Sequence, residues 1–556
     1  MNKKVCSFPI LFALLTLLIG TCAVVFPASA QAAPTSTGSI TVSGTVASSY
    51  DAYQIFSANV VDGDSDAKIA TDLAWASDAV RAAVLPVLHS AGMPNSQTTA
   101  QEAAEWLNTD SRLTSALSAR LARSLQSSGA VSVAPLNAGT ASELPSGYWL
   151  IVADDDAIAQ NEAGTAPIMA LVGGSAVTVK PKAATPKVSK HVLQDSTAAW
   201  QKAADATVAD DLYWRLSATV PAGLTAYDTY TVRFVDTMSA GLDPSKVAAS
   251  MRVYVAAGAD GGFDAVSADK DGRAGTEPAK GWTDITAQCA TKVAADGTFT
   301  VRTGDLIAAL DGPDAFTAGA RVVAVYNAPL NSACNHGIAK GNPNEVYLRY
   351  PRSPFADQSG DAGFTHTPSD DACAYTWDLA LTKRGSDGDK PLAGAVLSIA
   401  DDRGRTLAAD GTWDAEGKAT VTTGEDGRVT VSGVDSGKLE VRELKAPKGY
   451  TAFEGTRSVT VKAEGLDVDQ VAAAKPKLTI TAESPLRADS ADGSTGSLEA
   501  SLINTPTGTP PSITTGGFMP STGDMAMYAA AAAAVAGAAL IVVALLVKRG
   551  GGSHKE

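Results

Sequence analysis

This chain of 556 residues has few cysteines, few histidines and no net positive charge. It has five cysteines and five histidines, and Cys6 and Cys22 lie close to the amino terminus. A zinc-cluster protein, which needs several such ligands, is therefore not expected. The formal charge is −15, with 59 acidic and 44 basic side chains. A general attraction to the phosphates of a nucleic acid is not expected either.

The motifs of common turnover enzymes are also missing. The sequence has no nucleophile elbow, no phosphate-binding loop and no paired metal-ligand histidines, so an enzyme is the class that it favours least. Two acidic loops, residues 62–66 and 154–156, lack the complete calcium-binding pattern of an EF-hand. We expect these loops to be solvated turns, and we assign no metal and no cofactor.

The overall composition and the amino terminus indicate an exported protein of several domains. The chain has 27 prolines, 50 glycines and 19% charged residues, which excludes a collagen-like or wholly disordered protein. Residues 1–32 have the pattern of a secretory signal: Lys3 and Lys4, an apolar stretch at 9–26, and the small residues of Ala28-Ser29-Ala30. We therefore expect the mature chain to be secreted.

The carboxyl-terminal end carries a second targeting pattern. Residues 525–547 contain no charged side chain and are followed by Lys548 and Arg549. This stretch is long enough to cross a bilayer and leave a positive tail inside. Just before it stands Met519-Pro520-Ser521-Thr522-Gly523. Motif, span and tail together resemble the cell-wall sorting signal of Gram-positive surface proteins, in which leucine is usual at the position of Met519.

This resemblance implies a covalent attachment. A sortase cysteine would attack the carbonyl of Thr522, release Gly523 onward and pass the acyl group to an amine. The apolar segment would hold the precursor in the membrane until then. The alternative is a permanent transmembrane anchor preceded by a chance turn.

Strand and helix patterns divide the mature chain into three units, predicted at residues 33–182, 183–370 and 371–504. The first unit shows strand-like alternation at both ends and helical patterns at 77–89, 100–107 and 111–125, the second with a capping box of Thr99 and Glu102. The other two units consist of short alternating runs and tight turns, as β-sandwiches do. The predicted fold class is mainly β, with tandem immunoglobulin-like sandwiches, a helical insertion in the first, and a stalk at 505–518.

Three polar residues of the third unit share a strand face with apolar side chains, because alternate residues of a strand point to the same side. Lys383, Glu443 and Asn504 each end an alternating row of apolar residues. All three side chains are therefore expected to point into the sandwich.

The second unit repeats the pattern with Lys190, Asp236 and Asn344, drawn from its first, middle and last expected strands. Asn342 has the same parity as Asn344 and is the reserve candidate. It is disfavoured because Pro343 separates it from the regular strand.

An isolated buried lysine or carboxylate is costly, so each inward-facing set should satisfy its own polar groups. One option is a buried salt bridge capped by an amide, or a strand end that emerges into solvent. The other is an isopeptide bond, in which the lysine amine attacks the asparagine side-chain carbonyl and ammonia leaves. Burial lowers the pKa of a lysine and raises that of an acid, so Asp236 and Glu443 could serve as acid and base of a single-turnover, self-catalysed reaction.

Motifs around these residues resemble those of sortase-assembled major (backbone) pilins of Gram-positive bacteria. Residues 441–450, Val-Arg-Glu-Leu-Lys-Ala-Pro-Lys-Gly-Tyr, resemble the pilin E-box, and residues 377–383 resemble the opening strand of a collagen-adhesin (Cna) B-type domain. Residues 185–190, 235–238 and 341–350 resemble pieces of the A-type middle domain. The resemblance implies isopeptide bonds from Lys190 to Asn344 and from Lys383 to Asn504.

Lys182 is expected to face outward. In residues 177–182 the valines define one face, Lys180 and Lys182 have the opposite parity, and Pro181 restricts the backbone. The stretch is similar to the pilin motif in which a lysine directly after proline accepts the sorting threonine of the next subunit. Lys182 is therefore the expected acceptor and Lys180 the fallback, while a solvated linker lysine is the alternative.

The first unit and the cysteines set two further expectations. Lys68 is the only lysine between residues 33 and 179 and lies in an acidic loop, so no internal bond is expected there. The exported chain retains Cys289, Cys334 and Cys373. They allow one disulfide with one thiol left over, and their spacing does not select the pair.

Joining Thr522 of one copy to Lys182 of another gives a head-to-tail array that does not close and grows as a filament. The resemblance therefore implies a structural shaft subunit of a covalently polymerised, wall-anchored fimbria that supports adhesion. Its implied partners are identical subunits, pilin-type and housekeeping sortases, peptidoglycan, and accessory pilins at the tip or base; the sequence identifies no host ligand. The alternative is a monomeric wall-anchored adhesin or an accessory pilin, which would not need Lys182.

Overall fold

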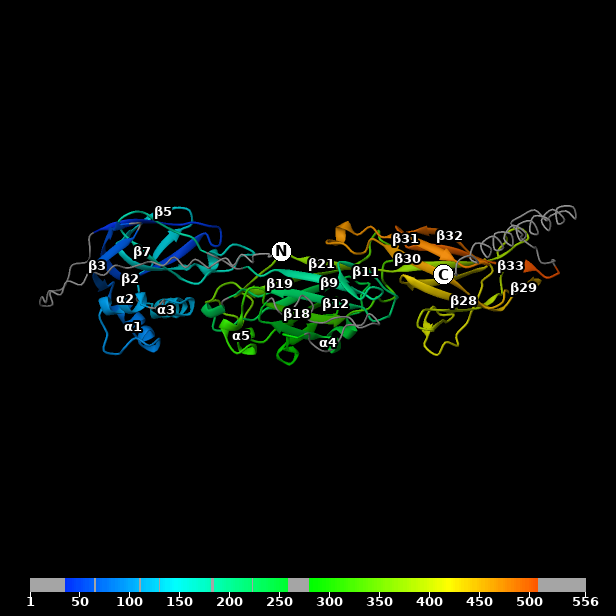
Figure 1. Cartoon of the computed structure of the whole chain (residues 1–556), viewed down its shortest axis with the longest axis horizontal. Coiled ribbons are helices and arrows are strands. Elements are labelled where there is room, and N and C mark those ends of the chain that lie inside the picture. The colour runs from blue at the N-terminus through cyan, green and yellow to red at the C-terminus, as the bar shows by residue number, and fades with distance from the viewer. Residues whose placement is uncertain are drawn as a thin grey trace, which may run out of the picture.

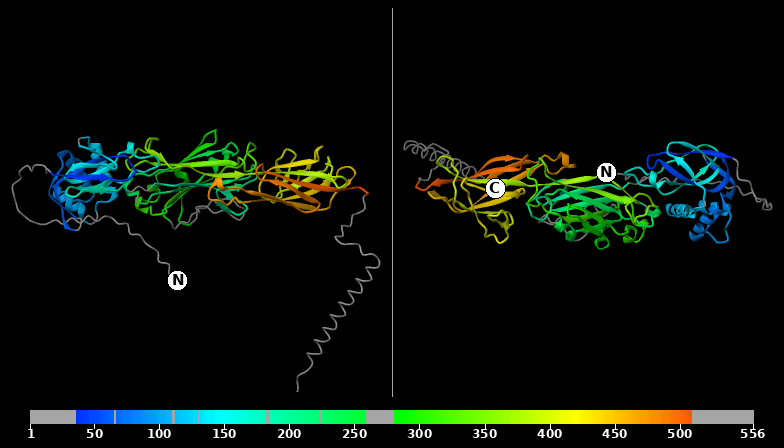
Figure 2. Two further views of the ribbon diagram at one scale, coloured as in Figure 1. Left: turned by 90° about the horizontal axis from the view of Figure 1, so that it is seen from above. Right: turned by 180° about the vertical axis from the view of Figure 1, so that it is seen from behind.

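The computed structural model describes residues 36–64, 67–109, 112–129, 131–181, 185–222, 224–258 and 280–508. They form three units placed end to end in an elongated body (Figure 1), which is also long and narrow in the other two views (Figure 2). The expected leader, Lys182, the sorting motif and the apolar stretch at 525–547 lie outside the described residues. Within the described part of the chain, no helix is both long and apolar enough to cross a membrane.

The first unit combines two sheets with three helices. β3, β2, β6 and β7 form one sheet, to which β4 is added beside β2, and β5, β1 and β8 form the other. The helices pack in one buried cluster with Phe56, Leu150 and Val152 of the larger sheet, and Figure 1 shows them on one side of it. The elements are β1 (Thr37–Val42), β2 (Ser49–Asp62), β3 (Lys68–Trp75), α1 (Asp78–Ser90), α2 (Ala100–Asn108), α3 (Ser115–Ser128), β4 (Ala134–Asn137), β5 (Ala141–Pro145), β6 (Gly147–Ala153), β7 (Ile168–Val172) and β8 (Val177–Val179).

The starts of these helices follow from capping side chains. Ser77 caps α1, and Thr99 and Glu102 form the predicted capping box at α2. α3 begins at Ser115 rather than at residue 111, because the side chain of Thr114 caps it and fixes the first turn there.

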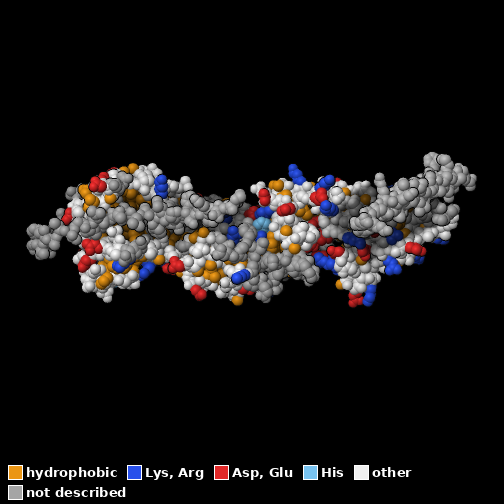
Figure 3. Space-filling model, viewed as in Figure 1, with side chains coloured by type: hydrophobic (Ala, Val, Ile, Leu, Met, Phe, Trp, Pro, Cys, Tyr) orange, Lys and Arg blue, Asp and Glu red, His pale blue; other side chains and the backbone are white. Residues whose placement is uncertain are grey.

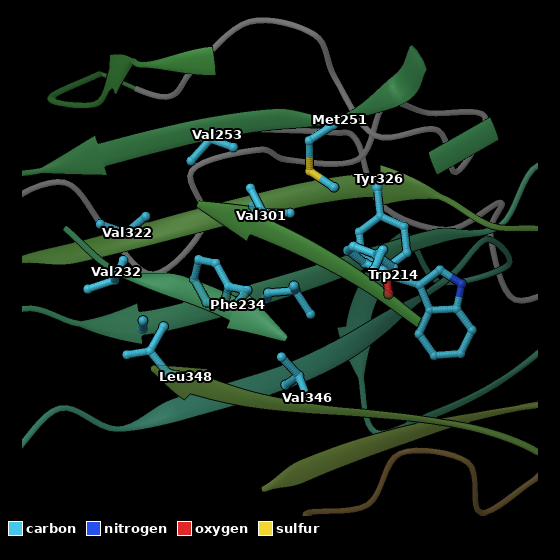
Figure 4. Close-up of a cluster of buried hydrophobic side chains, with 14 of the residues drawn as sticks. Trp214, Val232, Phe234, Met251, Val253, Val301, Val322, Tyr326, Val346 and Leu348 are labelled. Atoms are coloured by element: carbon cyan, nitrogen blue, oxygen red, sulfur yellow. The ribbon is translucent and has the colours of Figure 1, made fainter. Parts of the chain in front are cut away.

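The second unit is a sandwich of two large sheets. One has the order β10-β9-β12-β18-β14-β15, and the other β11-β21-β19-β13-β17-β16 with β20 beside β19. Figure 4 shows Trp214, Tyr326, Phe234 and Leu348, from strands of both sheets, meeting in the layer between them. The elements are β9 (Val188–Gln194), β10 (Ala199–Gln201), β11 (Ala203–Asp205), β12 (Tyr213–Thr219), β13 (Arg233–Met238), α4 (Val247–Ser250), β14 (Arg252–Ala256), β15 (Thr283–Asp284), β16 (Ala290–Val293), β17 (Thr298–Arg302), α5 (Leu306–Ala309), β18 (Arg321–Asn327), β19 (Asn342–Pro351), β20 (Phe364–His366) and β21 (Asp370–Tyr375).

Asn344 does not lie on the last strand of the second unit, contrary to the sequence prediction. β19 is followed by β20 and then by β21, which pairs with both β19 and β11. β21 also extends beyond residue 370, where the sequence placed the end of this unit. The strand is hard to recognise because its core-facing residues are only Ala372 and Ala374, whose small side chains give a weak hydrophobic pattern.

The third unit is a second sandwich, in which the first and last strands are neighbours. β22 pairs in parallel with β33 in the sheet β27-β22-β33-β29, where β32 also joins β33. The facing sheet has the order β25-β24-β23-β28-β30-β31, with β26 beside β23. The elements are β22 (Trp377–Gly385), β23 (Val396–Ala400), β24 (Thr406–Leu407), β25 (Trp413–Asp414), β26 (Val421–Thr422), β27 (Arg428–Val434), β28 (Gly437–Lys445), β29 (Tyr450–Thr451), β30 (Thr456–Glu464), β31 (Lys477–Ala482), β32 (Leu486–Asp492) and β33 (Ser497–Pro506).

The second and third units are joined by a short and well-bonded junction. Only Thr376 separates β21 from β22. The indole nitrogen of Trp377 donates to Asp205 Oδ2 at 2.8 Å across the junction. Arg405 of the third unit donates from both terminal nitrogens to the carboxylate of Asp210 in the second, at 2.5 and 2.8 Å. A bidentate pair of this kind fixes orientation as well as distance, so the two units are expected to move as one body.

The surface of the rod carries both signs of charge. On the face drawn in Figure 3, Lys and Arg side chains are interspersed with Asp and Glu side chains, and hydrophobic side chains appear as small separate areas. The described residues drawn on this face therefore form no broad patch of a single charge.

Replacing Arg405 by Ala should loosen the junction between the second and third units. The variant loses the bidentate pair with Asp210, so small-angle scattering should show a broader distribution of interatomic distances than that of the unaltered protein. Arg428→Ala removes an exposed ion pair with Glu499 inside the third unit and is the matched control. An unchanged scattering profile for Arg405→Ala would show that the pair does not hold the junction.

Candidate functional site

The second unit buries one lysine, one acid and one asparagine between its two sheets. Lys190 comes from β9 in one sheet, whereas Asp236 of β13 and Asn344 of β19 come from the facing sheet. All three residues have 0% solvent exposure. The predicted inward parity of these residues is therefore what the structure shows, and the lysine meets the other two across the sandwich.

A tyrosine hydroxyl connects the three side chains of this cluster. Lys190 Nζ contacts Asp236 Oδ2 directly and donates to the Tyr326 hydroxyl at 2.9 Å. Asn344 Nδ2 donates to the same hydroxyl at 2.8 Å, and the hydroxyl donates to Asp236 Oδ2 at 3.2 Å. The oxygens Asn344 Oδ1 and Asp236 Oδ1 are buried and have no hydrogen-bond partner. The amine, the acid and the amide thus all lie around one hydroxyl.

The reserve candidate, Asn342, is engaged elsewhere. Its Oδ1 accepts from the Asn335 backbone nitrogen at 2.8 Å, and its Nδ2 donates to the backbone oxygens of Asn335 and Ala374 at 2.9 and 3.2 Å. The amide of Asn342 is therefore satisfied by backbone groups, whereas Asn344 shares the Tyr326 hydroxyl with Lys190.

Burial shifts both ionisable groups of this cluster toward their uncharged forms. Loss of water lowers the pKa of Lys190, and the attraction of Asp236 only partly restores it. Loss of water likewise raises the pKa of Asp236, against the opposing pull of Lys190. Transfer of the proton from amine to acid is therefore far easier here than in water.

The third unit holds a second cluster with a different layout. Lys383 of β22 and Asn504 of β33 belong to neighbouring strands of one sheet, and Glu443 reaches them from β28 in the facing sheet. Lys383 Nζ lies 3.6 Å from Glu443 Oε1 and donates to the Leu502 backbone oxygen at 3.2 Å. Asn504 Nδ2 donates to the two oxygens of Glu443 at 2.9 and 3.1 Å. The acid thus bridges the amine and the amide directly.

This second cluster is also withheld from water. The side chains of Lys383 and Glu443 have 0% exposure, and Asn504 has 2%. Burial lowers the pKa of Lys383 to about 8, although Glu443 opposes the shift. Asn504 Oδ1, like its counterpart in the second unit, is buried without a hydrogen-bond partner.

The remaining predicted lysines occupy different surroundings. Lys68, the first residue of β3, donates to the backbone oxygens of Gly173 and Ser175 at 2.5 and 2.7 Å and to Asp62 Oδ1 at 3.3 Å. No asparagine is among these partners. Lys180, the fallback acceptor, is exposed just after β8.

The three cysteines are free thiols in the structure, so the disulfide that the sequence allowed does not form among them. Cys289 lies beside β16, and its thiol donates to the Ile285 backbone oxygen. Cys373 lies in β21, and its thiol donates to the Ala374 backbone oxygen. Among the described residues, no three His, Cys, Asp or Glu side chains are grouped so as to hold a metal ion.

Sequence reasoning missed two groups beside the Lys190 cluster. Tyr326 has the same parity in β18 as Val322 and Ala324, and a tyrosine at the end of an inward-facing apolar row was a signal of the same kind as the lysine. The other group is Lys202, whose Nζ contacts Asp370 Oδ2 and donates to the Lys190 backbone oxygen at 2.9 Å. Lys202 lies between the short strands β10 and β11 and does not end an apolar row, so no pattern in the sequence indicates its role.

Comparisons with known proteins agree with the residue-based resemblance. The family model described as the SpaA prealbumin-like fold domain matches residues 378–475. The chain is 30% identical over 143 residues to the trypsin-resistant surface T6 protein of Streptococcus pyogenes serotype M6, a match that covers 24% of each chain. The matched segment thus spans about a quarter of the length of this curated relative.

Two solved structures show similar chains. The T6 backbone pilin of serotype M6 Streptococcus pyogenes matches over 86% of this chain and 100% of its own, with 17% identity and a TM-score of 0.45. The full-length major pilin SpaD from Corynebacterium diphtheriae matches over 85% of this chain and 98% of its own, with 14% identity and a TM-score of 0.41.

The predicted fold class and the predicted resemblance are therefore both confirmed. The described residues form mainly β units in tandem. The match of residues 378–475 to the SpaA prealbumin-like fold domain and the sequence match to the T6 surface protein are the similarities that agree with the predicted resemblance.

Proposed function

We propose that this chain is the shaft subunit of a covalently polymerised fimbria, and that its second and third units each carry a lysine–asparagine isopeptide bond. The observation that supports this most strongly is the repeat of one chemical set in two successive units. Each buries a lysine, an acid and an asparagine in one connected cluster, linked through Tyr326 in the second unit and through Glu443 in the third, although the two sheets that supply them are arranged differently. The match to the T6 surface protein supports the same function.

In the third unit the reaction begins when Lys383 passes a proton to Glu443. The uncharged Nζ attacks the side-chain carbonyl carbon of Asn504, and a second proton moves from Nζ through Glu443 to Nδ2. The bond from the carbonyl carbon to Nδ2 then breaks and ammonia leaves. Folding supplies the proximity, and the acid acts once as base and acid. The chain is thus a substrate of its own single reaction and not a turnover enzyme.

A permanent salt bridge is the alternative in each cluster, and it leaves two problems. The carbonyl oxygens of Asn344 and Asn504 stay buried without a donor, and an unsatisfied buried acceptor costs about 1–3 kcal/mol. A buried ion pair also carries a desolvation penalty that its own attraction offsets only in part. Bond formation removes both charges and leaves a protonated acid that can donate to the new amide.

Assembly between subunits uses two segments that lie outside the described residues. Thr522 is the proposed acyl donor and Lys182, between β8 and β9, is the proposed acceptor. A pilin-type sortase joins the subunits, and a housekeeping sortase transfers the finished fimbria to peptidoglycan. Lys180 is exposed two residues earlier and is the fallback acceptor. The fimbria stands on the cell surface, with accessory pilins at its tip or base.

The mass of the secreted chain should reveal the internal bonds. Each bond releases one ammonia, so the measured intact mass should be lower than the sequence mass by two ammonia molecules. Glu443→Ala and Asp236→Ala should each restore one ammonia, because each removes the acid of one cluster. Glu440→Ala is the matched control, since Glu440 lies on the same strand with its side chain exposed. A full sequence mass in the unaltered chain would rule out both bonds.

Polymerisation should depend on a single lysine. Wall extracts of the native strain should give a high-mass ladder on immunoblots, and Lys182→Ala should reduce it to the monomer band. Lys187→Ala is the matched control, because Lys187 is exposed a few residues later. A ladder lost only in Lys180→Ala would move the acceptor to the fallback position. A single band in the native strain would favour the monomeric adhesin.

The position of Asn344 leads to a mechanical prediction. A bond from Lys190 to Asn344 closes a covalent loop that shields residues 191–343 from a pulling force. The hairpin between Asn344 and its partner Ala372 lies outside this loop. The base of this hairpin is held by Asp370, whose Oδ2 accepts from the Lys190 backbone nitrogen at 2.7 Å and contacts Lys202. The third unit has no such segment, because Lys383 and Asn504 lie on its first and last strands.

Single-molecule pulling should therefore show different extensions for the second and third units. The second should lengthen by about 90 Å, the extended length of the chain from Asn344 to Ala372 less its folded span, and the third should not lengthen. Lys202→Ala should lower the force of this step, whereas Lys292→Ala, at an exposed lysine of the same unit, should not. An extension that corresponds to complete unfolding of either sandwich would contradict the proposed bonds.

A further inference from the structure

The acids of the two clusters differ in length, and the structure compensates for the difference. Glu443 reaches Asn504 Nδ2 directly with both oxygens, at 2.9 and 3.1 Å. Asp236 is one methylene shorter, and its hydrogen bonds in this cluster go to Lys190 and Tyr326. The Tyr326 hydroxyl lies where the longer acid would reach, within 2.8 Å of Asn344 Nδ2.

Tyr326 is held firmly in this position. It lies in β18, in the interior of its sheet between β12 and β14, and has 0% exposure. Its ring packs edge-on against Phe299, with ring centres 4.8 Å apart. Lys190 Nζ lies 5.5 Å from the centre of this ring and 5.6 Å from that of Trp214, and Figure 4 shows these two rings together at one end of the core. Two aromatic rings thus confine the amine beside the hydroxyl.

We propose that Tyr326 is a catalytic residue of isopeptide formation in the second unit, carrying the proton from the attacking nitrogen to the leaving nitrogen. This inference rests on the proposed function, because it concerns the reaction of Lys190 with Asn344. The observation that supports it is the geometry of the hydroxyl, which contacts Lys190 Nζ, Asn344 Nδ2 and Asp236 at once.

Every proton that moves in the proposed step has a donor and an acceptor within the cluster. Asp236 first takes one proton from the Lys190 ammonium, which leaves an uncharged amine. Nζ then forms its bond to the carbonyl carbon of Asn344 and gives a proton to the Tyr326 oxygen, while the hydroxyl turns its own proton to Nδ2. The bond from the carbonyl carbon to Nδ2 breaks, ammonia leaves, and Tyr326 ends unchanged. Asp236 keeps the first proton and is uncharged in the product.

The surroundings keep the hydroxyl in the state that this role needs. Burial raises the pKa of Tyr326 well above its usual value, and the neighbouring Asp236 adds to the shift. The phenol therefore retains its proton until the tetrahedral intermediate supplies a basic nitrogen. A positioned proton donor typically contributes about 100-fold or more to the rate of such a step.

The test compares three forms of the full secreted chain by intact mass and peptide mapping at successive times after synthesis. The unaltered chain should lose two ammonia molecules. Tyr326→Phe, which keeps the ring, should promptly lose only the one from the third unit, and the second bond should form about 100-fold more slowly or not at all. Tyr350→Phe is the matched control, because it removes another hydroxyl of this unit from a residue with 0% exposure that is not a partner of the cluster.

A rescue separates catalysis from simple support of the fold. In Tyr326→Phe combined with Asp236→Glu, the longer acid should reach Asn344 as Glu443 reaches Asn504, and the second bond should return. Prompt loss of two ammonia molecules in Tyr326→Phe would overturn the role of Tyr326 while leaving the internal bonds intact. Failure of the rescue in a folded double variant would also overturn it. Loss of no ammonia in the unaltered chain would remove the proposed reaction itself.

Discussion

The arrangement of the second and third units depends on holding a lysine amine away from water beside an acid and an amide. Lys190 and Lys383 have no exposed surface, and an uncompensated buried ammonium is too costly to persist in a folded core. The neighbouring acids lower this cost in the unreacted chain. A reaction that turns amine and amide into one uncharged amide removes the cost, so the same burial that opposes folding also favours the chemistry.

The two clusters support the proposed reaction through different arrangements of strands. In the third unit the amine and the amide lie on neighbouring parallel strands, and an acid from the opposite sheet closes the set. In the second unit the lysine faces both partners across the sandwich, and a tyrosine hydroxyl fills the gap left by a shorter acid. With the proposed bond formed, the second unit would still depend on the noncovalent contacts of Asp370, because β21 continues the chain beyond the asparagine. The bidentate pair of Arg405 and Asp210 then links the second unit to the third.

Strand parity was sufficient to predict most of the site. Lys190, Asp236, Asn344, Lys383, Glu443 and Asn504 all point inward, because a single buried face imposes a period of two on every strand. The order of strands was harder to predict, and β21 was missed because its inward residues are alanines. Tyr326 was missed because a buried tyrosine is usually a core residue, and only the three-dimensional position of its hydroxyl relates it to the cluster. The sequence already favoured Asn344 over Asn342 because of Pro343, and the structure adds that backbone groups engage the amide of Asn342.

Mass-spectrometric mapping of the protease-digested native protein tests the central claim most directly. The account predicts branched peptides in which Lys190 is joined to Asn344 and Lys383 to Asn504, each lighter than its two linear components by one ammonia. Recovery of these four residues only in ordinary linear peptides, with free lysine and asparagine side chains, would contradict it.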